Sequence, residues 1–160
     1  MTKTNAARIL DRYGIKYELF SYEVDESDLS AVAVAEKLNQ NIDQVFKTLV
    51  LRGDKTGIFV CVIPGAEELD LKKAELLSGN KSCAMLPMKE ILQYTGYVRG
   101  GCSPIGMKKN YPTFIDEICI LYDSIFVSAG IRGMQLKISP DDLLKVTSGK
   151  TGDLLFLKNH

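Results

Sequence analysis

The sequence predicts an α+β fold in a single domain over residues 1–160, with a mixed, curved, barrel-like β-sheet flanked by short helices. Its 160 residues are enough to bury one core without disulfides or metals. Strand-like and helix-like segments follow one another irregularly, without the repeating order of a parallel α/β fold. Two β-branched runs within residues 44–64 are separated by a short glycine-containing turn, which indicates a hairpin at the centre of the sheet.

In the first half of the chain, elements are indicated by apolar spacing and by the residues that end each segment. Apolar residues recur at helical spacing up to Tyr13, with Thr2 or Thr4 as the N-cap and Gly14 just beyond the end. Apolar and polar residues then alternate over residues 16–24, which indicates a strand. The same reasoning predicts a helix at 31–39, the two strands of 44–64, a helix at 68–79, a strand at 82–86 and a helix at 87–96.

The second half begins with a stretch that fits neither a helix nor an ordinary strand. Residues 97–112, YVRGGCSPIGMKKNYP, contain three glycines, which accept left-handed backbone angles and allow another molecule to approach the main chain. This glycine loop is therefore expected to form a shaped backbone surface. After it, the sequence predicts strands at 113–116, 118–123, 124–130 and 133–139, and a helix at 140–147 that begins with a proline.

Charge and cysteine content exclude several classes of protein. Lysine plus arginine equal aspartate plus glutamate, at 20 each, so no overall basic field attracts a nucleic acid, and DNA is not expected as a partner. The four cysteines form no CxxC pair, which argues against zinc and redox motifs. We find neither an apolar run long enough to span a membrane nor a secretory signal, so we expect a cytoplasmic protein without a membrane partner.

The histidine content restricts the chemistry further. The sequence has one histidine, His160 at its last position, so a Ser-His-Asp triad, a Cys-His dyad and a histidine-rich metal site are not expected. SGKTG at 148–152 resembles the end of a phosphate-binding P-loop, but Leu144 stands where the first glycine should be, and a helix precedes it. We therefore expect no nucleotide hydrolysis, no metal and no cofactor.

Lys47 and Cys102 each allow two interpretations. Lys47 lies in VFKTLVL, where both alternating sets of residues are largely apolar, so both faces of this strand are expected to be covered. Its side chain either reaches water at the edge of the sheet or forms the floor of a cleft, where it donates hydrogen bonds to a carbonyl or a phosphate. Cys102 either fills a gap in the glycine loop or acts as a thiolate beside a lysine.

Five segments of the chain resemble, in order and spacing, the YbaK/EbsC family of Cys-tRNA(Pro) deacylases. They are KTNAARILDRYGIKYELFSYE, VFKTLV, LDLKKA, GGCSPIGMKKNYPTFID and VSAGIRGMQLKISPDDLL. The family is related to the editing domain that is inserted in bacterial prolyl-tRNA synthetases. The resemblance implies that the chain removes cysteine from mischarged Cys-tRNA(Pro), that it binds the 3′ end of this tRNA, that prolyl-tRNA synthetase is a further partner, and that no cofactor is needed.

The resemblance also implies a set of site residues. Lys47 falls on the family's essential lysine, and Tyr22 and Ser128 are further catalytic candidates. Lys108 and Lys109, which by themselves are typical of surface charge, become candidates for contacts with tRNA phosphates. The candidate substrate-binding residues are Gly100, Gly101, Ser103, Pro104, Gly106, Gly130, Arg132, Gly133 and Gln135, the last standing where well-studied members of the family carry an aspartate.

This reaction does not require a histidine in the core, because the substrate brings its own nucleophile. The thiol of cysteine has a pKa of about 8.5, and the resemblance implies that it attacks its own ester carbonyl while the protein holds the reactive conformer. Cys102 is then not the nucleophile. Two alternatives stay open: editing of another small aminoacyl-tRNA such as Ala-tRNA(Pro), and a non-catalytic module that binds an RNA end or a synthetase surface.

Overall fold

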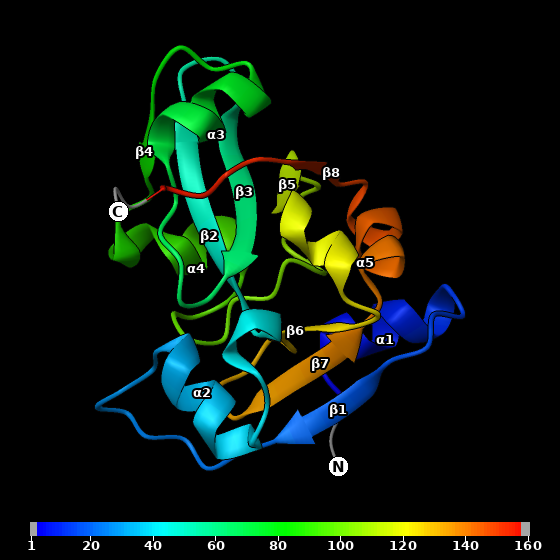
Figure 1. Ribbon diagram of the computed structural model, residues 1–160. Coiled ribbons are helices and arrows are strands. Elements are labelled where there is room, and N and C mark those ends of the chain that lie inside the picture. The colour runs from blue at the N-terminus through cyan, green and yellow to red at the C-terminus, as the bar shows by residue number, and fades with distance from the viewer. Residues whose placement is uncertain (1–2, 158–160) are drawn as a thin grey trace.

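The computed structural model describes residues 3–157 of the chain, so Thr2 and His160 lie outside the described residues. Short helices and two groups of strands alternate along the chain (Figure 1). The helices are α1 (Asn5–Arg12), α2 (Ala31–Leu38), α3 (Leu71–Ser78), α4 (Met88–Thr95) and α5 (Pro140–Thr147), with 3₁₀ turns η1 (Ile42–Gln44) and η2 (Glu117–Leu121). The strands are β1 (Glu18–Ser21), β2 (Phe46–Gly53), β3 (Gly57–Pro64), β4 (Cys83–Met85), β5 (Thr113–Asp116), β6 (Ile125–Ser128), β7 (Met134–Ile138) and β8 (Lys150–Gly152).

Polar side chains begin most of these helices. In each case a side-chain oxygen accepts a hydrogen bond from a backbone amide two or three residues further on, which satisfies a donor that the helix itself leaves unpaired. The capping residues are Thr4 at α1, Ser30 at α2, Asp70 at α3 and Ser139 at α5. Gly79 and Gly96 end α3 and α4 in the left-handed conformation, which glycine adopts without a steric penalty.

The strands form two sheets. One is a mixed five-stranded sheet in the order β4-β2-β3-β5-β8, antiparallel around the β2–β3 hairpin and parallel from β3 through β5 to β8. The other is a three-stranded antiparallel sheet in the order β1-β7-β6. The α+β class, the mixed sheet and the central hairpin are thus confirmed. The described strands do not close into a barrel, because β6 meets only the residue before β2, through an isolated bridge between Phe126 and Val45.

Two elements differ from the sequence-based prediction. The predicted strand at 118–123 is largely the 3₁₀ turn η2, because Asp116 accepts a hydrogen bond from the amide of Ile118 at 3.1 Å and turns the chain. Strand β8 was not predicted. It is three residues long, has no apolar alternation, and lies in the SGKTG segment, where it adds a parallel strand beside β5.

The three-stranded sheet buries both of its faces. On one face Ile125 and Val127 pack into the main core with Leu10 of α1 and Leu143 of α5. Phe126 points to the opposite face, where it packs against α2. Burying these apolar side chains is worth about 1.5–3 kcal/mol each and holds α1, α2 and α5 around the sheet. The region where this sheet approaches β2 is therefore fixed from both sides.

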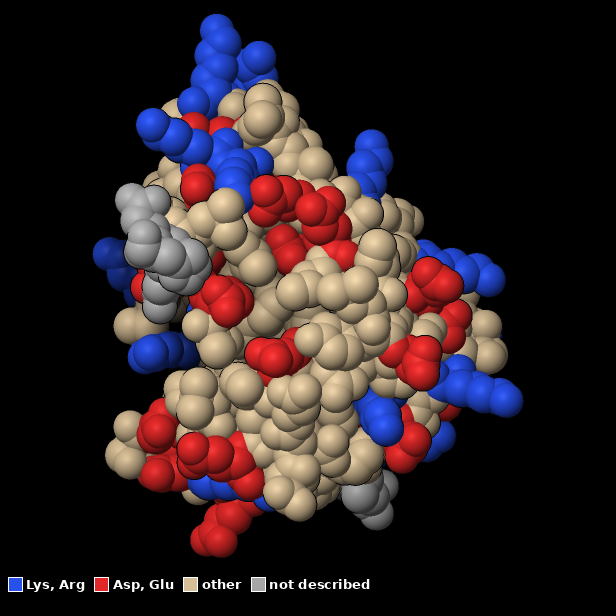
Figure 2. All heavy atoms as spheres, in the orientation of Figure 1, with Lys and Arg blue, Asp and Glu red and all other residues tan. Residues whose placement is uncertain are grey.

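The balanced charge of the sequence is unevenly distributed over the surface. On the face shown in Figure 2, lysine and arginine side chains gather over the end formed by α3 and the β2–β3 turn. Acidic side chains gather over α2 and the segment before it, which contains Glu23, Asp25, Glu26 and Asp28. Within residues 3–157, no helix has the length and apolar character needed to cross a membrane.

Candidate active site

A cavity of about 330 Å³ lies where the two sheets approach each other, which is within the usual size of small-ligand sites. Its walls come from the segment that enters α2, the start of β2, the glycine loop, the end of β6 and the first half of β7. The lining residues are Leu29, Ser30, Ala31, Val34, Val45, Phe46, Lys47, Thr48, Leu49, Gly65, Arg99, Gly100, Cys102, Ser128 and Gln135.

The cavity exists because one edge of β2 changes partners along its length. Strand β3 pairs with the other edge throughout, from Phe46 to Gly53. On the edge opposite β3, β6 meets the chain at Val45 and β4 pairs from Leu51 onward. Among the described strands, none pairs with the stretch 46–49 on that edge, so β2 contributes both side chains and backbone to the cavity wall.

Lys47 lies on this stretch and is half-buried. Burial disfavours the charged ammonium and lowers the pKa of Lys47, while the nearby carboxylates of Glu68 and Glu67 act in the opposite direction. Among the described residues no carboxylate forms an ion pair with Lys47. Of the two interpretations of this lysine, the structure favours the cleft floor, since the side chain lines the cavity and keeps donors available for a carbonyl oxygen.

The glycine loop forms a second wall through a tight turn. The amide of Gly101 donates a hydrogen bond to the carbonyl of Val98 at 3.0 Å, and Gly100 between them has a φ of +82°, as the third residue of a type II turn requires. The Arg132 guanidinium then donates to the Arg99 carbonyl at 2.8 Å and fixes the central peptide of the turn. The turn therefore presents Arg99 and Gly100 to the cavity in one conformation.

Gly101 allows the glycine loop to contact the segment after β6 at main-chain distance. A Cβ atom at Gly101 would lie 3.0 Å from the amide nitrogen of Arg132 and 3.1 Å from the carbonyl carbon of Ile131, and both are backbone atoms. Close approach of this kind is possible only for glycine. The loop and the 131–132 segment thus form one continuous wall.

We expect Gly101→Ala to lower the activity that the cavity supports. The loop must move away from Arg132 to make room for the methyl group, which displaces one wall of the cavity. The expected loss of activity is on the order of tenfold, since small displacements of a positioning wall reduce rates strongly. Gly57→Ala is the matched control: Gly57 has a φ of +68° in the hairpin turn and open space around it, so its variant loses stability but not activity. Equal activity of both variants, measured at equal folded fraction, would contradict this role.

The structure brings four of the residues predicted from the sequence to the cavity wall: Lys47, Gly100, Ser128 and Gln135. Ser128 and Gln135 lie directly opposite each other in the β6–β7 ladder. The side chain of Gln135 is buried, and its Oε1 has no hydrogen-bond partner among the described residues; the same holds for Oγ1 of Thr48. Buried polar atoms without partners are costly, so their place in this wall marks it as a polar binding surface.

Tyr22, Gly133 and Ser103, which were also predicted from the sequence, support the wall from behind. Tyr22 donates its backbone amide to the Gly133 carbonyl at 2.9 Å, and its side chain packs against the core around α2. The hydroxyl of Ser103 is fully buried and accepts a hydrogen bond from the amide of Ile105 at 3.2 Å, within the glycine loop. None of these side chains lines the cavity, so any catalytic part for Tyr22 stays a prediction.

Four further predicted residues also lie outside the lining. Gly130 allows the ring of Tyr97 to approach, with a Cβ position 3.0 Å from the ring. Arg132 bridges the Arg99 carbonyl and the carboxylate of Glu26, the latter at 2.7 Å. Pro104 is buried and Gly106 is partly exposed, and both border a small hollow on another side of the glycine loop.

Lys108 and Lys109 are exposed and do not line the cavity. The ammonium of Lys108 donates to the carbonyl of Gln93 at the end of α4, at a distance of 3.1 Å. Neither lysine forms an ion pair with a carboxylate among the described residues. Both are placed to meet a polyanion near the glycine loop, but not at the cavity itself.

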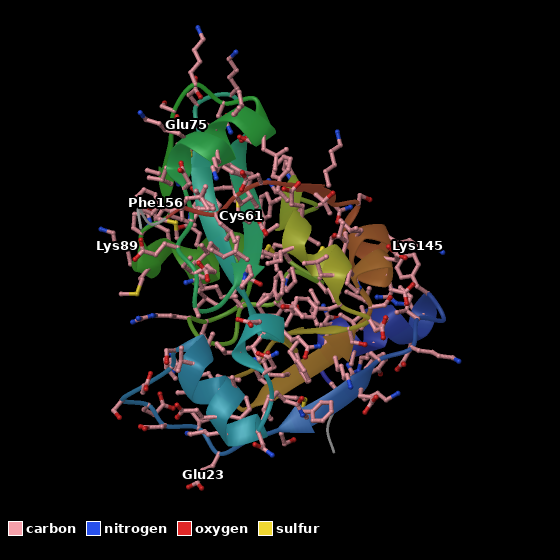
Figure 3. The ribbon with its side chains drawn as sticks, in the orientation of Figure 1. Glu23, Cys61, Glu75, Lys89, Lys145 and Phe156 are labelled. Atoms are coloured by element: carbon pink, nitrogen blue, oxygen red, sulfur yellow. The ribbon has the colours of Figure 1, made fainter. Side chains whose placement is uncertain are left out.

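The structure favours the interpretation of Cys102 as a space-filling side chain. Burial raises the pKa of its thiol to about 11, so the thiol stays protonated at neutral pH and is a poor nucleophile. Cys61, seen on β3 in Figure 3, is buried, and its pKa is raised to about 12 for the same reason. All four cysteines are free, and the residues described here contain no cluster of three metal-ligating side chains.

Sequence reasoning missed three polar residues of the cavity lining: Ser30, which caps α2, Thr48 and Arg99. Thr48 alternates with the apolar residues Phe46 and Val50 of its strand, and nothing in the sequence shows that β6 leaves this edge before β4 joins it. Arg99 immediately precedes the two glycines, and a cation beside a glycine-rich turn is a signal that could have found it. Lys47 and Arg99 are the two charged residues of the lining, and both are cations.

Comparison with known proteins identifies the family. Residues 26–146 match the aminoacyl-tRNA editing domain. EbsC of Enterococcus faecalis, named as a proposed Cys-tRNA(Pro)/Cys-tRNA(Cys) deacylase, is 47% identical over 152 residues, covering 95% of this chain and 93% of its own. A proline–tRNA ligase of Thermosipho africanus is 33% identical over 99 residues, which cover 62% of this chain and 17% of the ligase.

A solved structure described as a proposed trans-editing enzyme for prolyl-tRNA synthetase has the same fold. It superposes with a TM-score of 0.81 at 26% identity, covering 98% of this chain and 100% of the other. These matches confirm the resemblance seen in the sequence. The chain belongs to the family of aminoacyl-tRNA editing domains.

Proposed function

We propose that this chain is a deacylase that releases cysteine from mischarged Cys-tRNA(Pro), with the reaction taking place in the cavity around Lys47. The observation that carries the proposal is the composition of that cavity. It is small, has a half-buried lysine on its floor, offers unpartnered polar groups on Thr48 and Gln135, and contains no side chain that is a strong nucleophile at neutral pH. Such a site can position and stabilise a substrate that reacts with itself.

The substrate supplies the nucleophile in this mechanism. The cysteinyl thiol loses a proton to solvent, and its sulfur attacks the carbonyl carbon of its own ester. The new S–C bond forms, the C–O bond to the terminal ribose breaks, and the departing ribose oxygen takes up a proton. One water molecule then hydrolyses the released cysteine thiolactone to free cysteine. The net reaction is hydrolysis of one ester by one water, with no cofactor.

The residues of the wall have distinct parts in this proposal. Lys47 donates a hydrogen bond to the carbonyl oxygen, where negative charge develops during attack. Ser128, Gln135 and the backbone around Gly100 hold the aminoacyl group, which keeps the sulfur close to the carbonyl carbon. Tyr22 and the residues behind the glycine loop keep these groups in place.

This mechanism explains how the site distinguishes cysteine from proline. The two aminoacyl groups are similar in size, and fit alone separates such neighbours by about 1–3 kcal/mol. Proline has no thiol, so it cannot start the reaction even when it enters the cavity. Selectivity then comes from the chemistry of the substrate more than from the shape of the wall.

We further propose that the chain works in the cytoplasm together with prolyl-tRNA synthetase. The ligase and trans-editing relatives point to prolyl-tRNA synthetase as a partner, and the balanced charge of this chain suggests that free tRNA alone is held weakly. We also propose that Lys108 and Lys109 contact tRNA phosphates. We place the reaction in the cytoplasm, where aminoacyl-tRNAs are made and used.

The test is the deacylation of Cys-tRNA(Pro), Ala-tRNA(Pro) and Pro-tRNA(Pro) by the purified protein under identical conditions. We expect rapid loss of the cysteinyl ester and rates near the uncatalysed background for the other two. Rapid loss of the alanyl ester instead would show that the substrate is Ala-tRNA(Pro) and not Cys-tRNA(Pro). Binding of tRNA without loss of any ester would contradict the proposal and favour a non-catalytic module.

A further inference from the structure

Two cations line the cavity, and they occupy different environments. Lys47 lies on the floor and is half-buried, whereas Arg99 is exposed. A cavity of about 330 Å³ admits an aminoacyl group, but not the chain of nucleotides to which that group is attached. The RNA backbone must therefore remain at the mouth, where Arg99 lies.

Arg99 has no anionic partner within the part of the chain that the structure describes. The ion pairs of residues 3–157 involve other cations, among them Arg52 with Glu90 and Arg132 with Glu26. The lining of the cavity contains no carboxylate either. The guanidinium of Arg99 is therefore available for an anion that comes from outside, and its planar donors match a phosphate group.

The backbone of Arg99 is held although its side chain is unpaired. Arg99 is the second residue of the turn closed by the Gly101 amide and the Val98 carbonyl, and Gly100 supplies the left-handed conformation that the turn needs. The Arg132 Nε donates to the Arg99 carbonyl at 2.8 Å. An exposed arginine on a fixed turn loses less freedom on binding than one on a mobile loop.

Arg132 is held in turn by the segment before α2. Its Nη1 lies 2.7 Å from Oε2 of Glu26, so its charge is already compensated. The same segment contributes Leu29 and Ser30 to the cavity wall. Arg132, in the segment after β6, thus connects the glycine loop with the segment before α2. Its own charge is already paired, so it does not present a free cation to the cavity.

From this arrangement we infer that Arg99 binds the phosphodiester nearest the 3′-terminal nucleotide of the tRNA, and that Arg132 is a positioning residue for Arg99. This inference rests on the proposed function, because it takes the substrate to be an aminoacyl ester at the end of an RNA. In this arrangement Arg99, at the mouth of the cavity, makes the RNA contact that lies closest to the reacting bond. Lys108 and Lys109, which do not line the cavity, then contact more distant phosphates.

The experiment measures two quantities for wild type, Arg99→Gln and the control Arg8→Gln, which removes an exposed arginine of α1. The first is the binding of uncharged tRNA(Pro) at several salt concentrations. The second is single-turnover deacylation of Cys-tRNA(Pro) as a function of protein concentration. For Arg99→Gln we expect binding weakened on the order of tenfold and a salt slope smaller by about 0.7–0.9, as for the loss of one phosphate contact.

In deacylation, the half-saturating protein concentration should rise by the same factor while the maximal rate stays near the wild-type value, because the reacting groups are untouched. Arg8→Gln should match wild type in both measurements. An unchanged salt slope, or a loss confined to the maximal rate, would overturn the inference. If wild type binds tRNA but cleaves no ester, the proposed function fails while the binding arm still tests Arg99.

Arg132→Met tests the positioning part. It removes the hydrogen bond to the Arg99 carbonyl, so it should weaken tRNA binding in the same direction as Arg99→Gln. The two changes should be far from additive, because the second acts on a contact that the first has already removed. Additive losses would show that Arg132 acts independently of Arg99 and would overturn its assignment as a positioning residue.

Discussion

Replacing Lys47 by methionine is expected to reduce deacylation of Cys-tRNA(Pro) by about 10²–10³-fold, which is the usual cost of removing one hydrogen-bond donor from a site of developing negative charge. Methionine keeps much of the length and packing of the side chain but donates no hydrogen bond. The loss should appear in the maximal rate of a single-turnover experiment. Binding of uncharged tRNA(Pro) should change little, because the lysine lies at the floor and not at the mouth.

The same substitution is expected to raise the stability of the folded protein at neutral pH. Burial lowers the pKa of Lys47, which means that the folded state pays to keep the ammonium charged. Between this lowered pKa and the ordinary value of 10.5, the unfolded chain binds more protons, so wild-type stability rises with pH across that window. The advantage of Lys47→Met should therefore be largest at neutral pH and shrink as the pH rises through the window.

Urea unfolding at several pH values measures this effect, with Lys150→Met as the matched control. Lys150 lies exposed on β8 at the far edge of the five-stranded sheet, so its variant should equal wild type in both activity and stability. A variant at Lys47 that is both less active and less stable would indicate a structural lysine. A variant that keeps full activity would remove Lys47 from the mechanism.

Replacing the sulfur of the substrate by oxygen should lower the deacylation rate by a factor similar to that expected for Lys47→Met. Ser-tRNA(Pro) differs from Cys-tRNA(Pro) by oxygen in place of sulfur, and the cavity wall contains nothing that would exclude the smaller atom. The hydroxyl is a far weaker nucleophile, whereas a few per cent of the thiol is ionised near neutral pH. Initial rates with the two esters should differ by at least about 100-fold in favour of cysteine.

Much of the fold follows from local patterns. Apolar residues at helical spacing, together with the Thr4 cap of α1 and glycines just beyond α3 and α4, predicted the helices closely, because these signals act within a few residues of the chain. The hairpin of β2 and β3 was also predicted, since both strands are apolar and joined by a short turn. Strand β8 and the turn η2 were not, because they depend on a parallel partner and on a cap from Asp116.

The residues of the candidate site were likewise predicted where a local pattern marks them and missed where distant contacts place them. Lys47 was found because a lysine in a strand with two apolar faces is unusual, and the glycine loop was found from its composition. Thr48 and Arg99 were missed because their place depends on where β6 leaves β2 and on how Arg132 fixes the turn. Those contacts join segments that lie far apart in the sequence, so no local pattern gives the place of Thr48, and the adjacent glycines are the one local signal for Arg99.

The reaction of the substrate thiol beside Lys47 is tested most directly by one assay with four combinations: wild type and Lys47→Met, each with Cys-tRNA(Pro) and Ser-tRNA(Pro). We expect only wild type with the cysteinyl ester to react rapidly, because that combination alone has both the lysine donor and the substrate thiol. Equal rates of wild type on both esters would contradict attack by the substrate sulfur. Equal rates of the two proteins on the cysteinyl ester would contradict a reaction in the cavity around Lys47.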